Sequence, residues 1–354
     1  MRHGLTRFMS LLPGPRLLIL CAFVVASVWF ILAKSVQTES SRLIIGLALP
    51  QGIKELEFVN GTYETFAREV EARTSVKASI IYAGALGSPV ARLNQVRRGV
   101  IQMSDASDAN YATVYKDILV LNLPYLFPDK KTAHEVLDGP VGDLFAGRIR
   151  EKTGIKVLGW WESGGFRHFS SNTPITVPGD MQGLKMRVLG PLTRIMVESL
   201  GASAVSVSFS ELYTSLSTGV VDGQDNSLPV FNSTRLYEVQ SNLTTTAHSY
   251  AFAPLGINNA FFEQLPEQDQ RALQAAADVA VAFNRRVSGE LEAQALAITY
   301  EHGVNVNVLD SATRQAFARR VQPPAIKWLS DVIEDSSLIK MSLAAVANAS
   351  GSQP

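Results

Sequence analysis

The sequence contains almost no cysteine. Cys21 is the only one among 354 residues, and it lies inside an N-terminal apolar run. The rest of the chain therefore has no thiol for a disulfide, a cysteine–metal site or a cysteine nucleophile. The four residues before Cys21 are large and apolar, whereas a lipidated cysteine follows a small residue. A lipoprotein is thus the less favoured alternative to a plain export signal.

Neither sign of charge is in excess. The chain has 32 basic and 32 acidic residues and a formal net charge of +0. A neutral chain has no overall attraction for nucleic acid or for an anionic membrane, so we expect neither as a partner. Basic side chains that bind an anion must then do so locally. With 46% hydrophobic and 18% charged residues, the composition is typical of a folded globular protein.

Long apolar runs are also scarce, and the one that stands out is at residues 17–33. Arg16 and two earlier arginines precede it and Lys34 ends it, which is the pattern of a secretory signal peptide. The run is long for such a signal and slightly short for a membrane-spanning helix. We therefore expect residues 1–35 to be a signal peptide that is cleaved on export, with a retained membrane anchor as the alternative.

Motifs of common enzyme classes are missing as well. The sequence has no Gly-x-Ser-x-Gly elbow and no glycine-rich phosphate loop. The histidines beyond the apolar run are His134, His168, His248 and His302, and their spacing fits no metal site. These absences favour a binding protein without metal or cofactor. An exported enzyme remains the rival hypothesis, which a turnover assay on candidate substrates would test.

Strand-like and helix-like segments alternate along the chain. The first are a strand at 43–49, a helix at 62–73, a strand at 77–82, a helix at 88–99 and a strand at 100–103. Ser88 followed by Pro89 is a strong helix start, and Gly99 is a good helix stop. A long helix, or two nearly continuous ones interrupted at Gly289, is expected at 266–302. The alternation predicts an α/β fold with a mainly parallel sheet and helices on its faces.

The length of the chain is too great for one ordinary hydrophobic core and predicts two lobes. We expect the chain to cross between them near Ser163. The predicted segments are 42–163 and 252–290 for lobe I, 164–251 and 291–340 for lobe II, and 341–354 for a flexible tail.

Short motifs follow one another in a recognisable order. They are Ala85-Leu86-Gly87, Leu123-Pro124-Tyr125-Leu126-Phe127, Gly165-Phe166-Arg167, Gly183-Leu184-Lys185-Met186-Arg187-Val188, Phe209-Ser210-Glu211-Leu212-Tyr213, Asp222-Gly223-Gln224-Asp225-Asn226 and Leu236-Tyr237-Glu238-Val239-Gln240. In this order and spacing the sequence resembles the DctP-type solute-binding subunits of tripartite ATP-independent periplasmic (TRAP) transporters over residues 42–340. No single motif is strong, but so many in register are specific.

The resemblance implies a two-lobed α/β periplasmic binding protein with a ligand cleft between the lobes and a long helix that braces both. It implies a small organic acid with a carboxylate as the ligand, a TRAP permease in the membrane as the partner, a periplasmic location and no catalysis. We expect a monomer, with a dimer as the alternative. A membrane-tethered sensory binding protein is the second functional alternative, if the apolar run is retained.

Arg187 is the residue to which the resemblance assigns the carboxylate of the ligand. Its planar guanidinium offers two parallel hydrogen bonds that lysine cannot match. A surface arginine would be an equally good interpretation without the resemblance. Arg167 is expected to be a second carboxylate donor, or else a structural cation near the lobe crossing.

Four further residues follow from the motifs with open alternatives. The Asn226 amide can both donate and accept, which suits a carboxylate beside a hydroxyl. In the family pattern Phe209 packs on the carbon skeleton of the ligand, but ordinary core packing is an equal alternative. His248 resembles a histidine near an ordered water network, or is a simple hydrogen-bonded residue. Trp161 would line the cleft or pack in the core.

Asp105 and Asp108 follow the strand predicted at 100–103, where open α/β sheets bind ligands. Two carboxylates facing a cleft suit hydroxyl or cationic groups and repel a second carboxylate. We therefore predict a ligand with one carboxylate and a polyol or amino-bearing remainder. Solvated loop acids are the alternative interpretation.

Overall fold

The structure, a computed structural model, describes residues 41–351. The predicted signal peptide, Cys21 and the last three residues of the predicted tail lie outside this range. No helix within the described range is both long enough and apolar enough to cross a membrane.

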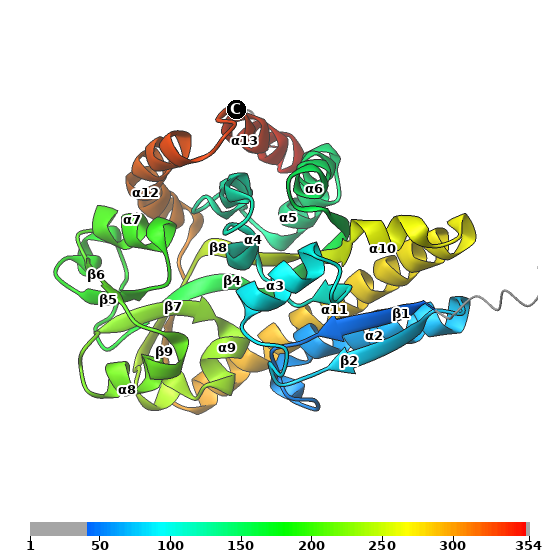
Figure 1. Cartoon of the computed structure of the whole chain (residues 1–354). Helices are drawn as coiled ribbons and strands as arrows, with labels where there is room; N and C mark the ends of the chain where they lie inside the picture. Colours follow the sequence, from blue (N-terminus) through cyan, green and yellow to red (C-terminus); the bar gives the residue numbers. More distant parts are fainter. Residues whose placement is uncertain (1–40, 352–354) are drawn as a thin grey trace, which may run out of the picture. The chain divides into compact units, whose positions relative to one another are not determined.

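A nine-stranded mixed sheet has the order β2-β1-β3-β8-β4-β7-β5-β6, and β9 pairs with β8 (Figure 1). The strands are β1 Arg42–Gly46, β2 Lys77–Ile81, β3 Met103–Ser104, β4 Ile155–Ser171, β5 Lys185–Val188, β6 Ser203–Ser206, β7 Gly223–Ser227, β8 Asn242–Asn258 and β9 Asn305–Asn307. Pairing is parallel among β1, β2 and β3 and among β5, β6 and β7. The predicted parallel sheet is thus present at both ends, with antiparallel strands between them.

Strands β4 and β8 connect the two parallel ends. Each has 17 residues, and they pair antiparallel with register shifts, one of them between Glu162 and Gly165. Gly164 and Gly165 have φ of 94° and 78°, a conformation that glycine adopts far more readily than other residues. From the sequence alone, residues 155–161 are expected to form a short strand that ends at Trp161. The strand is longer because the two glycines let it bend and continue.

Helices occupy most connections between the strands (Figure 1). They are α2 Glu57–Arg73, α3 Pro89–Arg97, α4 Asp108–Tyr111, α5 Lys130–Leu137, α6 Pro140–Thr153, α7 Pro191–Ser199, α8 Leu212–Ser217, α9 Leu228–Ser233, α10 Asn259–Gln264, α11 Glu267–Glu301, α12 Ser311–Val332 and α13 Ser337–Ala349. The predicted helix start at Ser88 is confirmed, because its side chain accepts a hydrogen bond from the backbone N–H of Ala91.

Buried apolar side chains form four core clusters. Cluster A includes Tyr111, Phe145 and Phe252, cluster B Phe66, Leu255 and Ala277, cluster C Phe169, Met186 and Phe317, and cluster D Leu216, Phe231 and Ala295. Helix α11 contributes Ala277 to cluster B and Ala295 to cluster D. The predicted long helix is therefore confirmed, and it braces two separate cores.

Helix α12 also belongs to two cores. Val321 packs in cluster C, whereas Ala325 and Leu329 pack in cluster A. Pro323 and Pro324 lie between these contacts, inside the helix. Proline has no backbone N–H, so the prolines remove two helical hydrogen bonds where the helix passes from one core to the other. The sequence placed all of residues 291–340 in one lobe, whereas α12 packs in two core clusters on either side of its prolines.

The C-terminal segment is helical rather than a flexible tail. Helix α13 extends to Ala349, and Leu338, Ile339 and Val346 are buried in cluster A. The expected tail at 341–354 is therefore wrong for residues 341–349. Apolar side chains at helical spacing give this segment a buried face. The prediction of a tail rested on the composition of the segment and did not consider this spacing.

Candidate functional site

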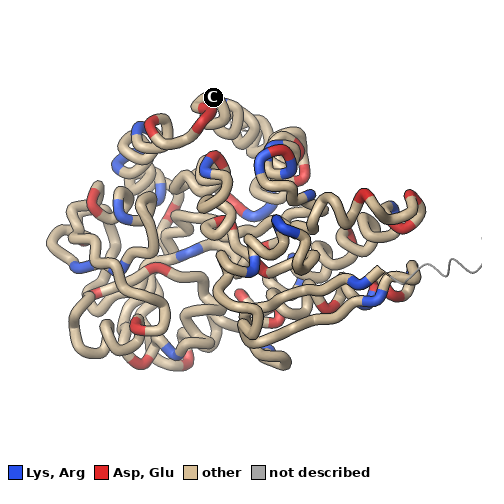
Figure 2. Tube along the Cα trace, in the orientation of Figure 1, with Lys and Arg blue, Asp and Glu red and all other residues tan. Residues whose placement is uncertain are grey.

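Lys and Arg residues are interspersed with Asp and Glu residues along the described part of the chain (Figure 2). The site must therefore be found from individual side chains. The candidate residues cluster on β4, β5, β7 and β8, where the two parallel ends of the sheet meet.

Arg187 on β5 is a buried cation without a counter-ion. Its residue is 1% exposed, and its Nε donates to the Val207 carbonyl oxygen at 3.0 Å. Neither terminal nitrogen has a hydrogen-bond partner among residues 41–351. Burial lowers the pKa of Arg187 to about 10, against the opposing influence of Asp225. A buried guanidinium with unused donors is unfavourable, so the geometry calls for an anion from outside the described chain.

Arg167 and Asp225 form an ion pair beside Arg187. Arg167 Nε donates to Asp225 Oδ2 at 2.6 Å, and its Nη2 donates to the Asp225 carbonyl oxygen at 2.7 Å. Burial alone would raise the pKa of Asp225, but Arg167 and His248 hold it well below its usual range. The second carboxylate oxygen, Asp225 Oδ1, is buried and has no partner in the described chain.

His248 on β8 completes this group. Its Nε2 lies 3.4 Å from Asp225 Oδ2 and its Nδ1 lies 2.8 Å from Thr246 Oγ1. Burial lowers the pKa of His248, which favours a neutral ring whose Nε2–H donates to Asp225 and whose Nδ1 accepts from the threonine hydroxyl. The ring stacks on Phe169, with centroids 4.3 Å apart. The histidine is thus held on three sides.

Asn226 belongs to a separate buried network. Its Nδ2 donates to Gln224 Oε1 at 2.6 Å, and Gln224 Nε2 donates to Ser170 Oγ at 2.7 Å. Adjacent strand residues point to opposite faces, so Asn226 and Gln224 share one face of β7 while Asp225 lies on the other.

The cavity beside the ion pair has a volume of about 520 Å³. Its lining includes Asp108 of α4 and Asn122, together with Arg167, Asp225 and His248. The start of α7 and Trp328 of α12 supply further walls. The cavity thus brings together three of the predicted residues, Asp108, Arg167 and His248. Arg187, Asn226, Phe209, Asp105 and Trp161 are not on its lining.

Asp105 is used inside the protein. Its Oδ1 accepts from Arg92 Nη2 at 2.6 Å and its Oδ2 accepts from the backbone N–H of Ala48 at 2.7 Å. Both side chains of this ion pair are at most 3% exposed. Full use of both oxygens argues against the predicted contact of Asp105 with a ligand. The prediction for Asp105 could not take account of Arg92, because the contact of this helix residue with the end of the strand cannot be seen in the sequence.

Asp108 and Asn122 line the same cavity as the Arg167–Asp225 ion pair. Burial raises the pKa of Asp108, and the Ala109 N–H, the Asn122 side chain and the charge of Arg167 oppose this rise. The Asn122 Oδ1 atom is buried without a partner in the described range. The sequence analysis did not single out Asn122, although it immediately precedes the motif at 123–127.

Phe209 and Trp161 lie in different surroundings. Phe209 is 51% exposed at the start of a short 3-10 helix, Phe209–Glu211, so the core alternative for it is wrong. Leu189, just after β5, is also exposed. Trp161 is buried in cluster B, edge-to-face on Tyr63, which is the core alternative for this residue.

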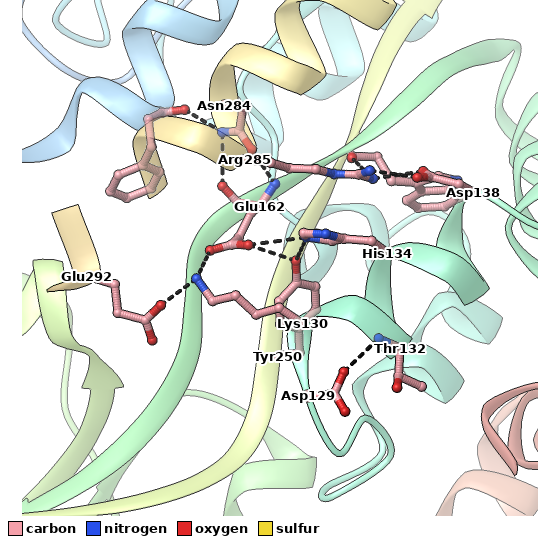
Figure 3. Close-up of polar contacts among 12 residues, drawn as sticks. Asp129, Lys130, Thr132, His134, Asp138, Glu162, Tyr250, Asn284, Arg285 and Glu292 are labelled. Carbon is pink, nitrogen blue, oxygen red and sulfur yellow. Dashed lines mark hydrogen bonds and ion pairs between the residues drawn. The ribbon is translucent and has the colours of Figure 1, made fainter. Parts of the chain in front are cut away.

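A second charged group lies beside the register shift of β4 and β8, near the predicted crossing of the chain between lobes. We call it the crossing cluster: Lys130, His134, Glu162, Tyr250 and Glu292 (Figure 3). Glu162 is 1% exposed. Its carboxylate accepts from Lys130 Nζ at 2.6 Å and from the Tyr250 hydroxyl at 3.0 Å. Lys130 also pairs with Glu292 of α11. The cluster therefore ties α5 to a long strand and to the bracing helix.

A larger cavity, of about 680 Å³, lies between α6, β4 and α11. None of the candidate residues lines it. Its Arg285 already has a bidentate partner in Asp138, at 2.6 and 2.7 Å. Within residues 41–351 no group of three or more His, Cys, Asp or Glu side chains could hold a metal ion. The unpaired Arg187 and the neighbouring smaller cavity remain the better candidate.

Comparison with known proteins places this geometry in a family. The model of "bacterial extracellular solute-binding protein, family 7" (DctP) matches residues 52–330. A solute-binding protein of Verminephrobacter eiseniae is 36% identical over 264 residues, which is 73% of this chain and 78% of that protein.

Two solved structures are similar in fold and sequence. A TRAP periplasmic solute-binding protein from Ochrobactrum anthropi, with its C-terminus bound in the ligand-binding pocket, has a TM-score of 0.82 and 28% identity over 88% of this chain and 96% of that one. One from Sulfitobacter sp. NAS-14.1 with bound β-D-galacturonate has a TM-score of 0.76 and 28% identity over 87% of this chain and 100% of that one.

The fold matches two-lobed binding proteins whose ligand lies between the lobes. The family consists of solute-binding transport proteins rather than enzymes. By the family model, by its relatives and by its fold, this chain belongs to the DctP family of TRAP periplasmic solute-binding proteins.

Proposed function

We propose that this chain is the solute-binding subunit of a TRAP transporter, and that it captures a small organic acid by its carboxylate and delivers it to a membrane permease. The observation that carries the proposal is the Arg187 guanidinium, buried with both terminal nitrogens unpaired in the described range. A carboxylate would accept two parallel hydrogen bonds from it and relieve the unfavourable burial of an unpaired cation.

Arg167 and Phe209 have distinct parts in this proposal. The protein hydrogen bonds of Arg167 use Nε and Nη2, so Nη1 is available to the ligand. Asp225 fixes the orientation of this guanidinium. Phe209, half exposed in the unliganded chain, would cover the carbon skeleton of the ligand. Asn226 would join the carboxylate through its free oxygen or a bridging water.

Ligand capture would favour a closed arrangement of two lobes. Groups on both sides of the cleft touch the ligand together only when the lobes close, so binding shifts the population toward the closed state. The predicted lobe boundaries belong to this proposal. Strands β4 and β8 and helices α11 and α12 would be the segments that bend.

Export by the N-terminal signal would place the protein in the periplasm. We expect it to be a monomer there. The apolar run at 17–33 is long for a signal peptide. The alternative, a membrane-tethered sensory binding protein, therefore has to be tested. N-terminal sequencing of the exported protein separates the two. A mature start near residue 35 supports the transport subunit, and an intact N-terminus supports the tethered form.

The binding site is tested by thermal shift against a library of organic acids. A ligand that binds only the folded protein raises its Tm. We expect Arg187→Ala to lose the rise that the best acid gives, and Arg194→Ala, which removes an exposed arginine on α7, to keep it. An unchanged rise in Arg187→Ala would overturn the assignment of the carboxylate to this residue.

A further inference from the structure

We propose that the 520 Å³ cavity selects a monocarboxylate whose remainder carries hydrogen-bond donors, hydroxyl or ammonium groups, and that Asn122 is a specificity residue that reads them. This inference rests on the proposed function, since it assumes that the acid end of the ligand meets the arginines. It adds the chemistry of the other end.

The cavity presents acceptor atoms that lack donors. Asn122 Oδ1 and Asp225 Oδ1 are buried and have no hydrogen-bond partner in the part of the chain that the structure describes. Both residues line the cavity together with Asp108. A buried acceptor left unpaired is unfavourable by more than an ordinary hydrogen bond gains. A ligand that brings donors to these oxygens therefore gains affinity that a bare hydrocarbon chain cannot.

The orientation of the Asn122 amide follows from its neighbour. The Asn122 side chain lowers the pKa of Asp108 against the effect of burial, and an amide does this by turning its N–H group toward the carboxylate. The Nδ2 group must therefore face Asp108, and Oδ1 is the end left for the cavity. Asn122 ends the 3-10 helix Lys116–Asn122, a short element of defined geometry. The amide thus forms a fixed acceptor rather than a flexible one.

The charge of the same wall disfavours a second carboxylate. A dicarboxylate with one end on Arg187 would bring its other end toward Asp108 and Asn122 Oδ1, where like charge and unpaired acceptors oppose it. Lys116 also lines the cavity but is exposed, so water screens its charge. The acidic side of the wall therefore dominates the choice.

The remaining walls suit the carbon skeleton of such an acid. Leu119, Leu192 and Trp328 are on the lining and can pack against carbon-bound hydrogens. The volume of about 520 Å³ lies within the range of small-molecule sites. The cavity therefore has an apolar surface for a carbon chain as well as acceptors for its substituents.

The test uses six-carbon acids that differ only in their substituents. D-gluconate, D-galactonate, D-glucuronate and D-galacturonate carry one carboxylate and several hydroxyls, and 6-aminohexanoate carries an ammonium. Hexanoate has no donor and adipate has a second carboxylate. By calorimetry we expect at least one donor-bearing acid to bind about 100-fold more tightly than hexanoate and adipate. The proposal is overturned if hexanoate or adipate binds as well as the best donor-bearing acid, or if no donor-bearing acid binds.

Variants separate this inference from the proposed function. Asn122→Leu should weaken the best donor-bearing acid at least about 10-fold and leave hexanoate unchanged, and Asn122→Ser gives the same test with a smaller change in packing. Asn305→Leu, the same change at an exposed position of β9, should leave the affinity for both acids unchanged. Arg187→Ala should abolish binding of every acid. Loss in Arg187→Ala with no effect of Asn122→Leu or Asn122→Ser would remove the role of Asn122 and keep the function.

Discussion

Two histidines on the long strands are kept neutral by burial. His168 is 5% exposed and His248 is fully buried. Burial, together with the nearby charges of Arg314 and Arg167, lowers the pKa of His168 to about 3, and burial also lowers the pKa of His248. The unfolded chain takes up protons near pH 6.5 at both positions, whereas the folded chain does not.

The stability of the protein should therefore fall with acidification. Because the unfolded state binds more protons below pH 6.5, the free energy of unfolding decreases as the pH drops from about 6.5 toward 3, by about 1.4 kcal/mol per pH unit from His168, and the lowered pKa of His248 adds to this decrease. We expect His168→Asn to reduce this slope between pH 6 and pH 4 by about one histidine's share. Urea unfolding across that pH range measures it. Equal slopes in both proteins would show that His168 titrates alike folded and unfolded.

The sequence could identify candidate site residues where they lie in a motif, but it could not show which other residues they contact. Arg187 and Arg167 were found as arginines in motifs. The sequence could not show that Asp105 is taken by Arg92, because that contact depends on how a helix packs on a strand end. The same holds for Asn122, whose role depends on the cavity and on Asp108.

At the scale of single elements, α6 contains two glycines in contrasting surroundings. A Cβ at Gly142 would lie 1.7 Å from the Leu137 carbonyl oxygen, whereas a Cβ at Gly147 would meet nothing within 4 Å. Gly142 is therefore needed for the close approach of α5 and α6. Gly147 only adds backbone freedom to the unfolded chain.

The two glycines of α6 should respond in opposite directions to alanine. We expect Gly142→Ala to lower the free energy of unfolding by about 1–3 kcal/mol, because backbone atoms must move apart. Gly147→Ala should raise it by about 0.5–1 kcal/mol through helix propensity. Chemical denaturation of the matched pair measures both. Destabilisation by Gly147→Ala as large as that by Gly142→Ala would contradict the packing argument.

Element types followed well from local sequence, and element ends followed less well. The start of α3 and the full length of α11 were predicted because caps and helical periodicity are local signals. The length of β4 was missed because it depends on two glycines whose role is to bend a strand. Helix α13 was missed because its apolar face has meaning only against cluster A.

At the scale of the whole described chain, the crossing cluster joins elements that are far apart in sequence (Figure 3). Lys130 forms ion pairs with both Glu162 and Glu292, and these two carboxylates come from a long strand and from the bracing helix. Burial and the two acids act in opposite directions on Lys130, and the acids prevail and raise its pKa. The ammonium is thus charged at neutral pH.

Removing the lysine should leave two facing carboxylates without a cation. We expect Lys130→Met to lower the free energy of unfolding by about 3–5 kcal/mol, since one of the acids is almost fully buried. Lys131→Met, the same change at the next and exposed residue, should stay within about 0.5 kcal/mol of the parent. Urea denaturation at pH 7 measures both. Equal stability of the two variants would show that the cluster contributes nothing to holding the elements together.

All four cores include residues from the last third of the chain. Cluster A contains Leu329, cluster B Leu273, cluster C Phe317 and cluster D Val304. These residues are synthesised in the last third of translation, so no core can be completed before then. The nascent polypeptide consequently keeps every core incomplete for most of its synthesis, which is a state in which a chain can still be threaded through a narrow export channel.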